Sequence, residues 1–368
     1  MTGRSFGRPR PFCYTDGLFP QISRAGEWFL RSGVQTPDGG VARYCRLDLA
    51  RNHAASTEIT GYSASTFVFL HSLTKDQRYL DRAHAAARFL TSAWDATSRS
   101  MPFEIAPAEY AYFFDCGIIV RGLLSVWRVT GESEFLDCAC AVGQSMAHDF
   151  AAPGGQFHPV LTLPDKRPLE RDPLRWSRST GCYQLKAGMA WWDLWEITGD
   201  LRYRQLYEGL LEDSLHTYAD FLPGHPDQRK VVDRLHAFLY FLEGLLPLAS
   251  DAACTAALSE GIQSVARYLR EFAPEFERSD IYAQLLRVRL YADCAGVVPL
   301  DHAAAPWEAS RLLEFAASAD DARVDGGFYF GRTAGAWEPF INPVSTAFAL
   351  QALALWNHSG QAHRHRLI

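Results

Sequence analysis

The sequence predicts an all-α fold in which six helical hairpins close into a ring, an (α/α)6 toroid. Apolar residues recur at helical spacing through most of the 368 residues, whereas strand-like alternation is confined to short stretches. The connections between helices also alternate between tight turns and long loops. Helices joined in this way place all the long loops on one face of a ring that has six inner and six outer helices.

The hydrophobic periodicity predicts twelve helices that alternate between outer and inner positions. The outer helices, which come first in each pair, are expected to be amphipathic, and the inner ones to be apolar on nearly every side. The stretches YSASTFVFLHSL and LHAFLYFLEGLLPLA show this second pattern. The predicted helices cover about residues 20–33, 59–74, 76–95, 115–130, 133–149, 182–198, 201–219, 231–248, 252–272, 280–293, 306–317 and 343–358.

Tight turns are predicted where an inner helix passes to the next outer helix. The segments SLTKDQRYLDRA, RVTGESEFLDCA and EITGDLRYRQLY repeat one design, in which a helix ends, a short turn follows and a new helix begins. A glycine in such a turn suits the left-handed position just after a helix. The acidic residue that follows suits the positive end of the next helix.

Longer loops are predicted where an outer helix passes to the next inner helix. Three of them carry a Gly-Gly pair beside a short alternating stretch, which indicates a small β-hairpin. No Pro- or Ser-rich linker divides the chain. Residues 1–368 are therefore predicted to form one domain, with flexible ends of about 15 residues at the N-terminus and about 10 at the C-terminus.

Composition and charge narrow the possible partners and location. The formal net charge of −6 gives no indication of a nucleic-acid partner. No apolar run reaches the roughly 18 residues that span a membrane, and the N-terminal segment has no apolar signal core. Eight scattered cysteines without C-x-x-C spacing favour reduced thiols over a metal site, so a cytoplasmic location is expected. Phosphate-binding and H-E-x-x-H motifs are missing, and no cofactor is expected.

In such a ring, the first turn of every inner helix faces one central cavity. Polar residues stand at all six of these positions, and four of them are carboxylates. N-capping and the helix dipole also favour acids there, but they do not require Tyr, Lys, His and Gln in the same turns. The sequence therefore predicts a polar pocket whose candidate catalytic residues are Glu58, Asp115, Asp280 and Asp233.

Other polar and aromatic residues at these helix starts and in the long loops are candidates for substrate binding. Arginine binds carboxylate or phosphate in a bidentate way, and aromatic rings stack on sugar faces. This combination suits an acidic or highly hydroxylated ligand, and Trp176 in the arginine-rich loop RDPLRWSRST adds a further aromatic group. The predicted binding residues are Tyr62, Arg43, Tyr44, Tyr183, Gln184, Lys186, His236, Gln284, Trp337, Glu338 and Asn342.

Several segments together resemble the six-hairpin glycosidase-like superfamily of (α/α)6 toroids. They are DGG followed by EITGYSASTFVFL, then FFDCGIIVRGLLSVWRVTGE, DRLHAFLYFLEGLL, RSDIYAQLLRVRL and INPVSTAFALQALALW. The resemblance extends over about residues 20–358 and is closest to members associated with bacterial polysaccharide biosynthesis. It implies a site at the inner-helix mouths. Its relatives by fold include glycoside hydrolases, polysaccharide lyases and glucuronyl C5-epimerases.

The predicted function is that of an enzyme acting on a small saccharide or an oligosaccharide. A hydrolase would use two of the carboxylates, one of them protonated. A uronate epimerase or lyase would instead use Tyr62, Tyr183, Lys186 or His236 as acid and base, with an arginine on the substrate carboxylate.

Two alternatives from other classes remain. One is a terpenoid or prenyl cyclase on a similar toroid, although the acidic D-x-D-D string is missing. The other is a non-catalytic glycan-binding protein. The sequence makes no prediction of oligomeric state.

Overall fold

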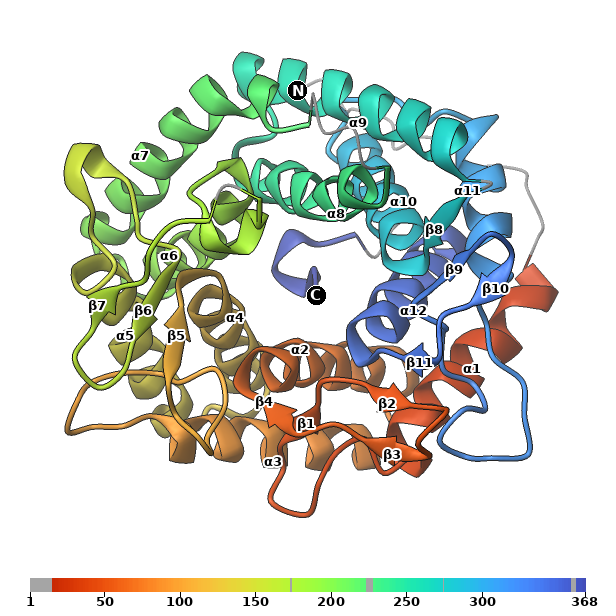
Figure 1. Cartoon of the computed structure of the whole chain (residues 1–368), viewed down its shortest axis with the longest axis horizontal. Helices are drawn as coiled ribbons and strands as arrows, with labels where there is room; N and C mark the ends of the chain where they lie inside the picture. Colours follow the sequence, from red (N-terminus) through yellow and green to blue (C-terminus); the bar gives the residue numbers. More distant parts are fainter. Residues whose placement is uncertain (1–14, 173, 223–227, 274, 359–361) are drawn as a thin grey trace, which may run out of the picture.

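A computed structural model of the chain describes residues 15–172, 174–222, 228–273, 275–358 and 362–368. Within these residues, helices form an inner and an outer ring around a common axis (Figure 1). The inner helices are α2 (Thr57–Thr74), α4 (Phe113–Thr130), α6 (Leu185–Thr198), α8 (Gln228–Gly244), α10 (Ser279–Cys294) and α12 (Pro343–Asn357). The outer helices are α1 (Thr15–Arg31), α3 (Gln77–Ala93), α5 (Ser133–His148), α7 (Leu201–Thr217), α9 (Ala252–Phe272) and α11 (Ala304–Leu313). The predicted toroid, with the even-numbered helices inside, is confirmed.

Three differences from the predicted boundaries can be described locally. α11 ends at Leu313 because the next residues pair with a later segment, as in the bridge between Ala316 and Phe328. α6 begins at Leu185 because a short 3-10 turn over Cys182–Gln184 precedes it. α8 ends at Gly244 and is followed by another 3-10 turn.

The tight turns follow the predicted design. Gly131 and Gly199 end α4 and α6 with φ of 74° and 73°, a conformation that glycine adopts without strain. Asp76 and Asp200 then begin α3 and α7, and each carboxylate accepts a hydrogen bond from a main-chain N–H of the first turn.

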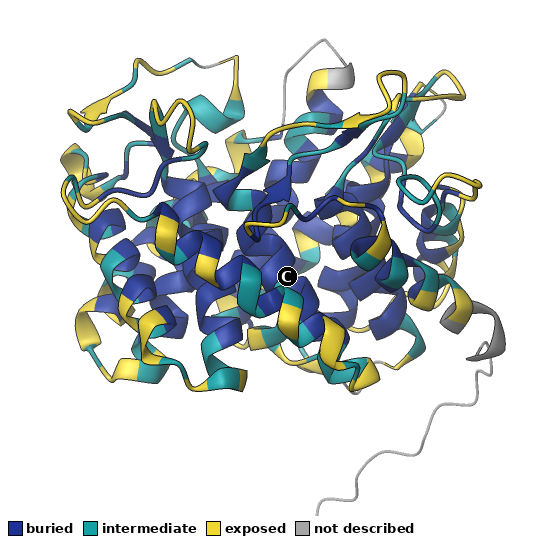
Figure 2. Ribbon diagram, turned by 90° about the horizontal axis from the view of Figure 1, so that it is seen from below, coloured by how far each residue is buried: buried dark blue, intermediate teal, exposed yellow. Residues whose placement is uncertain are grey.

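Burial separates the two rings as their sequences predict. Every residue of α10 from Ser279 to Ala292 is buried, and so is every residue of α12 from Pro343 to Leu355. The outer helices expose one face to solvent (Figure 2). Within the described part of the chain, no helix combines the length and the apolar character needed to cross a bilayer.

Glycines allow three inner helices to approach closely. A Cβ atom on Gly61 of α2 would lie 3.1 Å from the Ile118 carbonyl oxygen of α4, and one on Gly122 would lie 2.5 Å from the Gly61 oxygen. A Cβ on Gly117 would likewise lie 2.4 Å from Cα of Ala187 in α6. The close contact of α2 with α4 brings their first turns together, where Glu58 and Asp115 are located.

Four small antiparallel sheets lie on the face that carries the long loops (Figure 2). One of them, β11–β2–β3, joins the last long loop to the first, because Phe340 pairs with Arg46 and Ile341 with Cys45. Among the helices, α12 closes the ring in the same way, because it packs against both α1 and α2. The strands are β1 (Val41–Ala42), β2 (Cys45–Arg46), β3 (Arg51–Asn52), β4 (Ala55–Ser56), β5 (Tyr110–Tyr112), β6 (Val160–Thr162), β7 (Arg167–Pro168), β8 (Phe276–Arg278), β9 (Gly331–Thr333), β10 (Ala336–Trp337) and β11 (Phe340–Ile341).

The segment 362–368 differs from the prediction of a flexible C-terminus. It lies at the centre of the ring (Figure 1), and Leu367 and Ile368 are only 2% and 1% exposed. The main-chain oxygen of Ile368 accepts hydrogen bonds from Nζ of Lys186 at 3.1 Å and from Arg287 at 3.2 Å. The prediction was wrong for these residues because HRHRLI has no periodicity that would reveal a buried end. The expectation of a flexible N-terminus falls on residues 1–14, which lie outside the described residues.

Candidate active site

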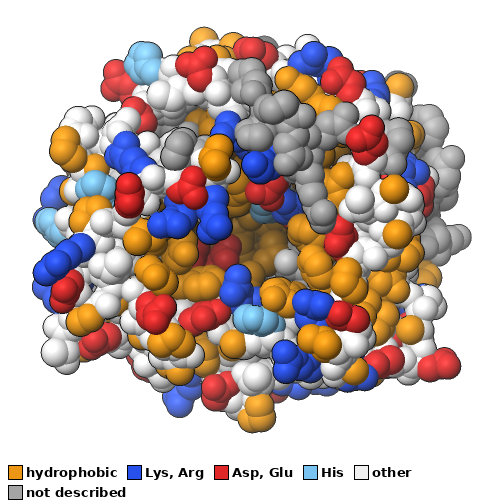
Figure 3. All heavy atoms as spheres, in the orientation of Figure 1, with side chains coloured by type: hydrophobic (Ala, Val, Ile, Leu, Met, Phe, Trp, Pro, Cys, Tyr) orange, Lys and Arg blue, Asp and Glu red, His pale blue; other side chains and the backbone are white. Residues whose placement is uncertain are grey.

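A pocket of about 360 Å³ opens on the loop face, at the mouth of the inner ring (Figure 3). This volume lies in the range of small-molecule sites. The pocket brings together predicted residues from all six predicted inner-helix starts and from the first long loop. They are Arg43, Tyr44, Glu58, Asp115, Tyr183, Asp233, His236, Asp280 and Asn342.

One wall of the pocket holds a pair of carboxyl groups. Glu58 lies in the first turn of α2 and Asp115 in the first turn of α4. Removal from water raises the pKa of Glu58 to about 7, and Arg43 opposes this shift. Burial, and then the charge of Glu58, raise the pKa of Asp115 well above its usual value. The pair therefore holds a proton at neutral pH.

Compensation for this pair is weak. Arg43, the cation that acts on both carboxyls, donates to Oε1 of Glu104 at 3.1 Å and lies 4.8 Å from the ring centre of Phe103. Oδ2 of Asp115 is buried and has no hydrogen-bond partner among the described residues. A buried oxygen of this kind is available to a ligand that enters the pocket.

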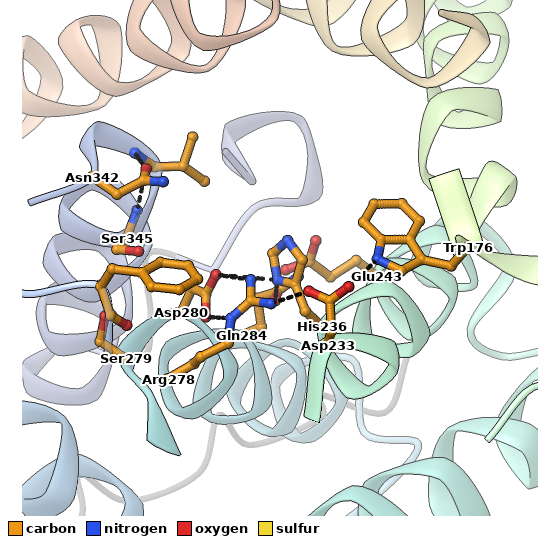
Figure 4. A network of polar contacts seen from close by, with 12 residues as sticks. Trp176, Asp233, His236, Glu243, Arg278, Ser279, Asp280, Gln284, Asn342 and Ser345 are labelled. Carbon is orange, nitrogen blue, oxygen red and sulfur yellow. Dashed lines mark hydrogen bonds and ion pairs between the residues drawn. The ribbon is translucent and has the colours of Figure 1, made fainter. Parts of the chain in front are cut away.

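The facing wall is organised by Arg278, at the end of β8. Its Nε and one terminal nitrogen donate to the two carboxylate oxygens of Asp280 at 3.0 and 2.6 Å, and its other terminal nitrogen pairs with Asp233 (Figure 4). Trp176 donates from Nε1 to the second oxygen of Asp233 at 2.7 Å. Burial alone would raise the pKa of Asp280, but Arg278 and His236 lower it. Asp280 is therefore an ionised carboxylate with both oxygens bound.

His236 stands beside this ion pair on α8. Its Nδ1 lies 2.6 Å from Oε1 of Gln284 and 3.4 Å from Oδ2 of Asp280. Its ring centre is 4.5 Å from that of Tyr240, which also lines the pocket. Burial lowers the pKa of His236 against the opposing charge of Asp280, so the imidazole is neutral at pH 7.

Three predicted binding residues are buried outside the pocket lining and hold the structure around it. Gln284 contacts His236, as described above. Gln184 donates to the main-chain oxygen of Phe157 at 3.2 Å and accepts from the main-chain N–H of Gly181 at 3.3 Å. Tyr62 packs edge-on against Phe348 at 5.4 Å, and burial raises the pKa of its hydroxyl.

Lys186 lies deeper still, also outside the pocket lining. Its ammonium group donates to Oε2 of Glu243 at 2.8 Å, and both side chains are fully buried. Burial lowers the pKa of Lys186 to about 7, although Glu243 opposes the shift. The prediction placed Lys186 in the pocket because it assumed that α6 begins at residue 182. The 3-10 turn before α6 instead presents Tyr183 to the pocket.

Trp337 and Glu338 lie in and just after the β9–β10 hairpin, outside the pocket lining. Trp337 is 41% exposed and stacks on Tyr329 at 4.8 Å. Glu338 accepts a hydrogen bond from Thr333 at 2.7 Å. Neither residue is brought together with the carboxyl pair.

Several lining residues were not predicted from the sequence, among them Tyr240, Arg278 and Phe330. Tyr240 follows His236 by one helical turn and shares its face of α8, a spacing that could have identified it. Arg278 stands two residues before Asp280, outside the helical pattern. Nothing in the local sequence distinguishes it from a solvated arginine.

No protein-family model matches the sequence, and a comparison with curated proteins gives no match. Solved structures of similar fold include a sugar epimerase from a ruminal bacterium, with a TM-score of 0.69 and 10% identity over 92% of this chain and 97% of that one. Cellobiose 2-epimerase from Bacillus thermoamylovorans has a TM-score of 0.69 and 12% identity over 93% and 99%.

Unsaturated glucuronyl hydrolase from Bacillus sp. GL1 has a TM-score of 0.69 and 14% identity over 94% of this chain and 98% of that one. At such low identities the likeness is one of fold. It confirms the predicted fold, an (α/α)6 toroid.

Proposed function

We propose that the protein is a carbohydrate-active enzyme that hydrolyses a glycosidic bond, with Asp115 as general acid. The observation that carries this proposal is the pair of neighbouring carboxyls with raised pKa on the pocket wall. Glycoside hydrolysis needs a carboxyl that is protonated at neutral pH and gives its proton to the leaving oxygen. The charge of Glu58 serves this chemistry, because it keeps the proton on Asp115.

The rest of the pocket supports a saccharide ligand. Aromatic side chains from several elements line it, among them Tyr44, Phe114 and Trp176, and these can stack on sugar rings. The solved structures of similar fold are named as enzymes that act on sugars. We further place the protein in the cytoplasm, since all cysteines in the described residues are free. The resemblance of its sequence motifs suggests a role in polysaccharide biosynthesis.

The test is hydrolysis of a panel of aryl glycosides and oligosaccharides by the wild type and by Asp115→Asn and Glu58→Gln. Each variant is expected to lower kcat/KM by about 10²- to 10⁴-fold. Asp165→Asn is the matched control, because Asp165 is 61% exposed in the β6–β7 turn. Full activity of Asp115→Asn would remove it from the reaction. A wild type that binds saccharides without turnover would favour the glycan-binding alternative.

Epimerisation or elimination on a uronate is the second candidate. Arg43 favours it, because its side chain is 36% exposed at the pocket and could exchange Glu104 for a substrate carboxylate. Elimination produces a conjugated double bond that absorbs in the ultraviolet, and C5 epimerisation exchanges hydrogen with D₂O. Either signal from uronate-containing saccharides, lost in Arg43→Gln, would replace the hydrolase proposal.

A further inference from the structure

We infer that His236 is the catalytic base of this pocket and takes up, at Nε2, a proton from the water that attacks the glycosidic carbon. Asp280 and Gln284 are assigned as its positioning residues. This inference rests on the proposed hydrolysis and supplies the half of the reaction that Glu58 and Asp115 leave open.

The position of His236 in the ring is the first argument. The inner helices follow one another around the axis, so α8 stands opposite α2, and α10 stands opposite α4 (Figure 1). His236 on α8 therefore faces Glu58 on α2 across one shared pocket. A sugar ring bound between His236 and the Glu58–Asp115 pair meets the proton donor, Asp115, on one side and the basic nitrogen of His236 on the other.

The hydrogen-bond partners of Nδ1 determine which ring nitrogen carries the proton. Nδ1 faces two oxygens, Oε1 of Gln284 at 2.6 Å and Oδ2 of Asp280 at 3.4 Å. Asp280 can only accept, because Arg278 binds both of its oxygens and its pKa is lowered. The carboxylate would favour a proton on Nδ1 even if the Gln284 amide were reversed. The lone pair of the neutral ring is therefore on Nε2.

Nε2 is directed toward the pocket. Figure 4 shows the second ring nitrogen of His236 on the side away from its contact with Asp280, toward the axis of the ring. No side chain in the described part of the chain forms a hydrogen bond with it, and His236 contributes to the pocket lining. A water held between Nε2 and a bound sugar would thus find its proton acceptor already oriented.

Three charged groups act on His236, and burial keeps its imidazole neutral against the two that are anionic. The three groups belong to Asp280 on α10, Arg278 at the end of β8, and Asp233 on its own helix. Burial is the dominant effect and lowers the pKa of His236, with Arg278 acting in the same direction and the two carboxylates opposing it. At neutral pH the imidazole is a base, while the carboxyl pair across the pocket holds a proton.

The step then balances without a further reactant. The water oxygen forms a bond to the anomeric carbon as the bond from that carbon to the leaving oxygen breaks. Asp115 gives its proton to the leaving oxygen, and the proton of the water passes to Nε2 of His236. Solvent returns the proton from His236 to the carboxyl pair. Because water displaces the leaving group directly, the anomeric configuration is inverted.

The first test does not depend on turnover. Nitrogen-15 NMR of histidine-labelled wild-type protein, with the signal assigned by its absence in His236→Gln, should show a neutral ring protonated at Nδ1 at pH 7. A ring protonated at Nε2, or an imidazolium, overturns the inference even if the protein hydrolyses glycosides.

The second test is kinetic. His236→Ala should lower kcat/KM by about 10²- to 10⁴-fold and abolish the acidic limb of the pH profile. Azide should partly restore turnover and yield a glycosyl azide of inverted configuration. His84→Ala is the matched control, since His84 is a half-buried histidine of α3 that pairs with Glu132 at 2.9 Å. If His236→Ala fails to fold, His236→Gln replaces it in this test.

The outcomes separate the two proposals. If Asp115→Asn is inactive while His236→Ala keeps wild-type activity, or if wild-type product retains its configuration, the base assignment is overturned and the hydrolase proposal stands. If the wild type hydrolyses none of the glycosides, both fall. Gln284→Met should lower kcat with little change in KM, because it only releases Nδ1; an unchanged kcat would remove Gln284 as a positioning residue.

Discussion

Two groups of charged residues lie on the axis of the ring, one at the pocket and one about two helical turns deeper. In the deeper group, Glu243 pairs with both Lys186 and Arg287, and all three side chains are fully buried. In the upper group, Arg43 is the one cation among the described residues that acts on Glu58 and Asp115, and it is itself engaged by Glu104.

The consequences for ionisation are opposite. Burial alone would raise the pKa of Glu243, but Arg287 and Lys186 lower it, whereas the pKa values of Glu58 and Asp115 are raised. Both groups are withdrawn from water, so burial does not distinguish them. The difference is charge compensation. A buried carboxylate paired with cations stabilises the fold, whereas a buried carboxyl without a free cation stays protonated and can donate its proton in a reaction.

The largest effect on stability is expected from Glu243→Gln. The change removes the carboxylate that pairs with both Lys186 and Arg287 in fully buried surroundings. It should lower the free energy of unfolding by about 3–5 kcal/mol, measured by urea denaturation. Glu271→Gln is the control, because Glu271 is 49% exposed and lies 4.0 Å from Arg267, and it should cost less than about 1 kcal/mol. A loss equal to the control would show that the deeper group is not structural.

A smaller effect of opposite sign is expected from Glu58→Gln. Folding raises the pKa of Glu58 from 4.5 to about 7. Between these pH values the folded protein keeps a proton that the unfolded chain has released, so stability falls as pH rises through this window. Glutamine does not titrate, and at pH 8 the variant should be more stable than wild type, on the order of 1–3 kcal/mol, with little difference at pH 4.5.

Urea denaturation at both pH values measures this difference. The exposed Glu109→Gln provides the control, which should show no pH-dependent gain. A Glu58→Gln variant that is less stable than wild type at pH 8 would mean that the upper carboxyl is compensated after all.

The smallest effect is expected from Trp337→Ala. Trp337 lies outside the pocket lining and stacks on Tyr329, so its removal should raise KM by no more than about threefold. Tyr44→Ala, which removes an aromatic ring from the pocket itself, should raise KM by about tenfold. Equal losses in steady-state assays would extend the site over the β9–β10 hairpin.

The architecture could be predicted because helical periodicity runs through the chain and the tight-turn design occurs three times. The sequence also placed Glu58, Asp115, Asp233 and Asp280 at one cavity, since each stands at the start of an inner helix. It did not separate them by role. That distinction depends on Arg278, which lies before α10 and neutralises two of the four carboxylates.

The sequence also did not predict how deep a residue lies along the ring axis. Lys186 and Tyr183 are neighbours in one predicted turn, yet only Tyr183 reaches the pocket. The difference arises from a short 3-10 turn that leaves no mark on hydrophobic periodicity. The burial of Ile368 was unpredictable for a similar reason, because its partners come from helices distant in sequence.

The inserted segment 362–368 determines how a ligand can travel. Leu367 and Ile368 lie on the axis beneath the pocket, against the fully buried Lys186 and Arg287, so the ring is blocked from its far side. A ligand must therefore enter, and a product must leave, through the loop face. A polysaccharide therefore cannot thread through the ring, and any ligand reaches Asp115 from the loop face. Substrate and product would thus share one entrance, and the product must leave before the next ligand binds.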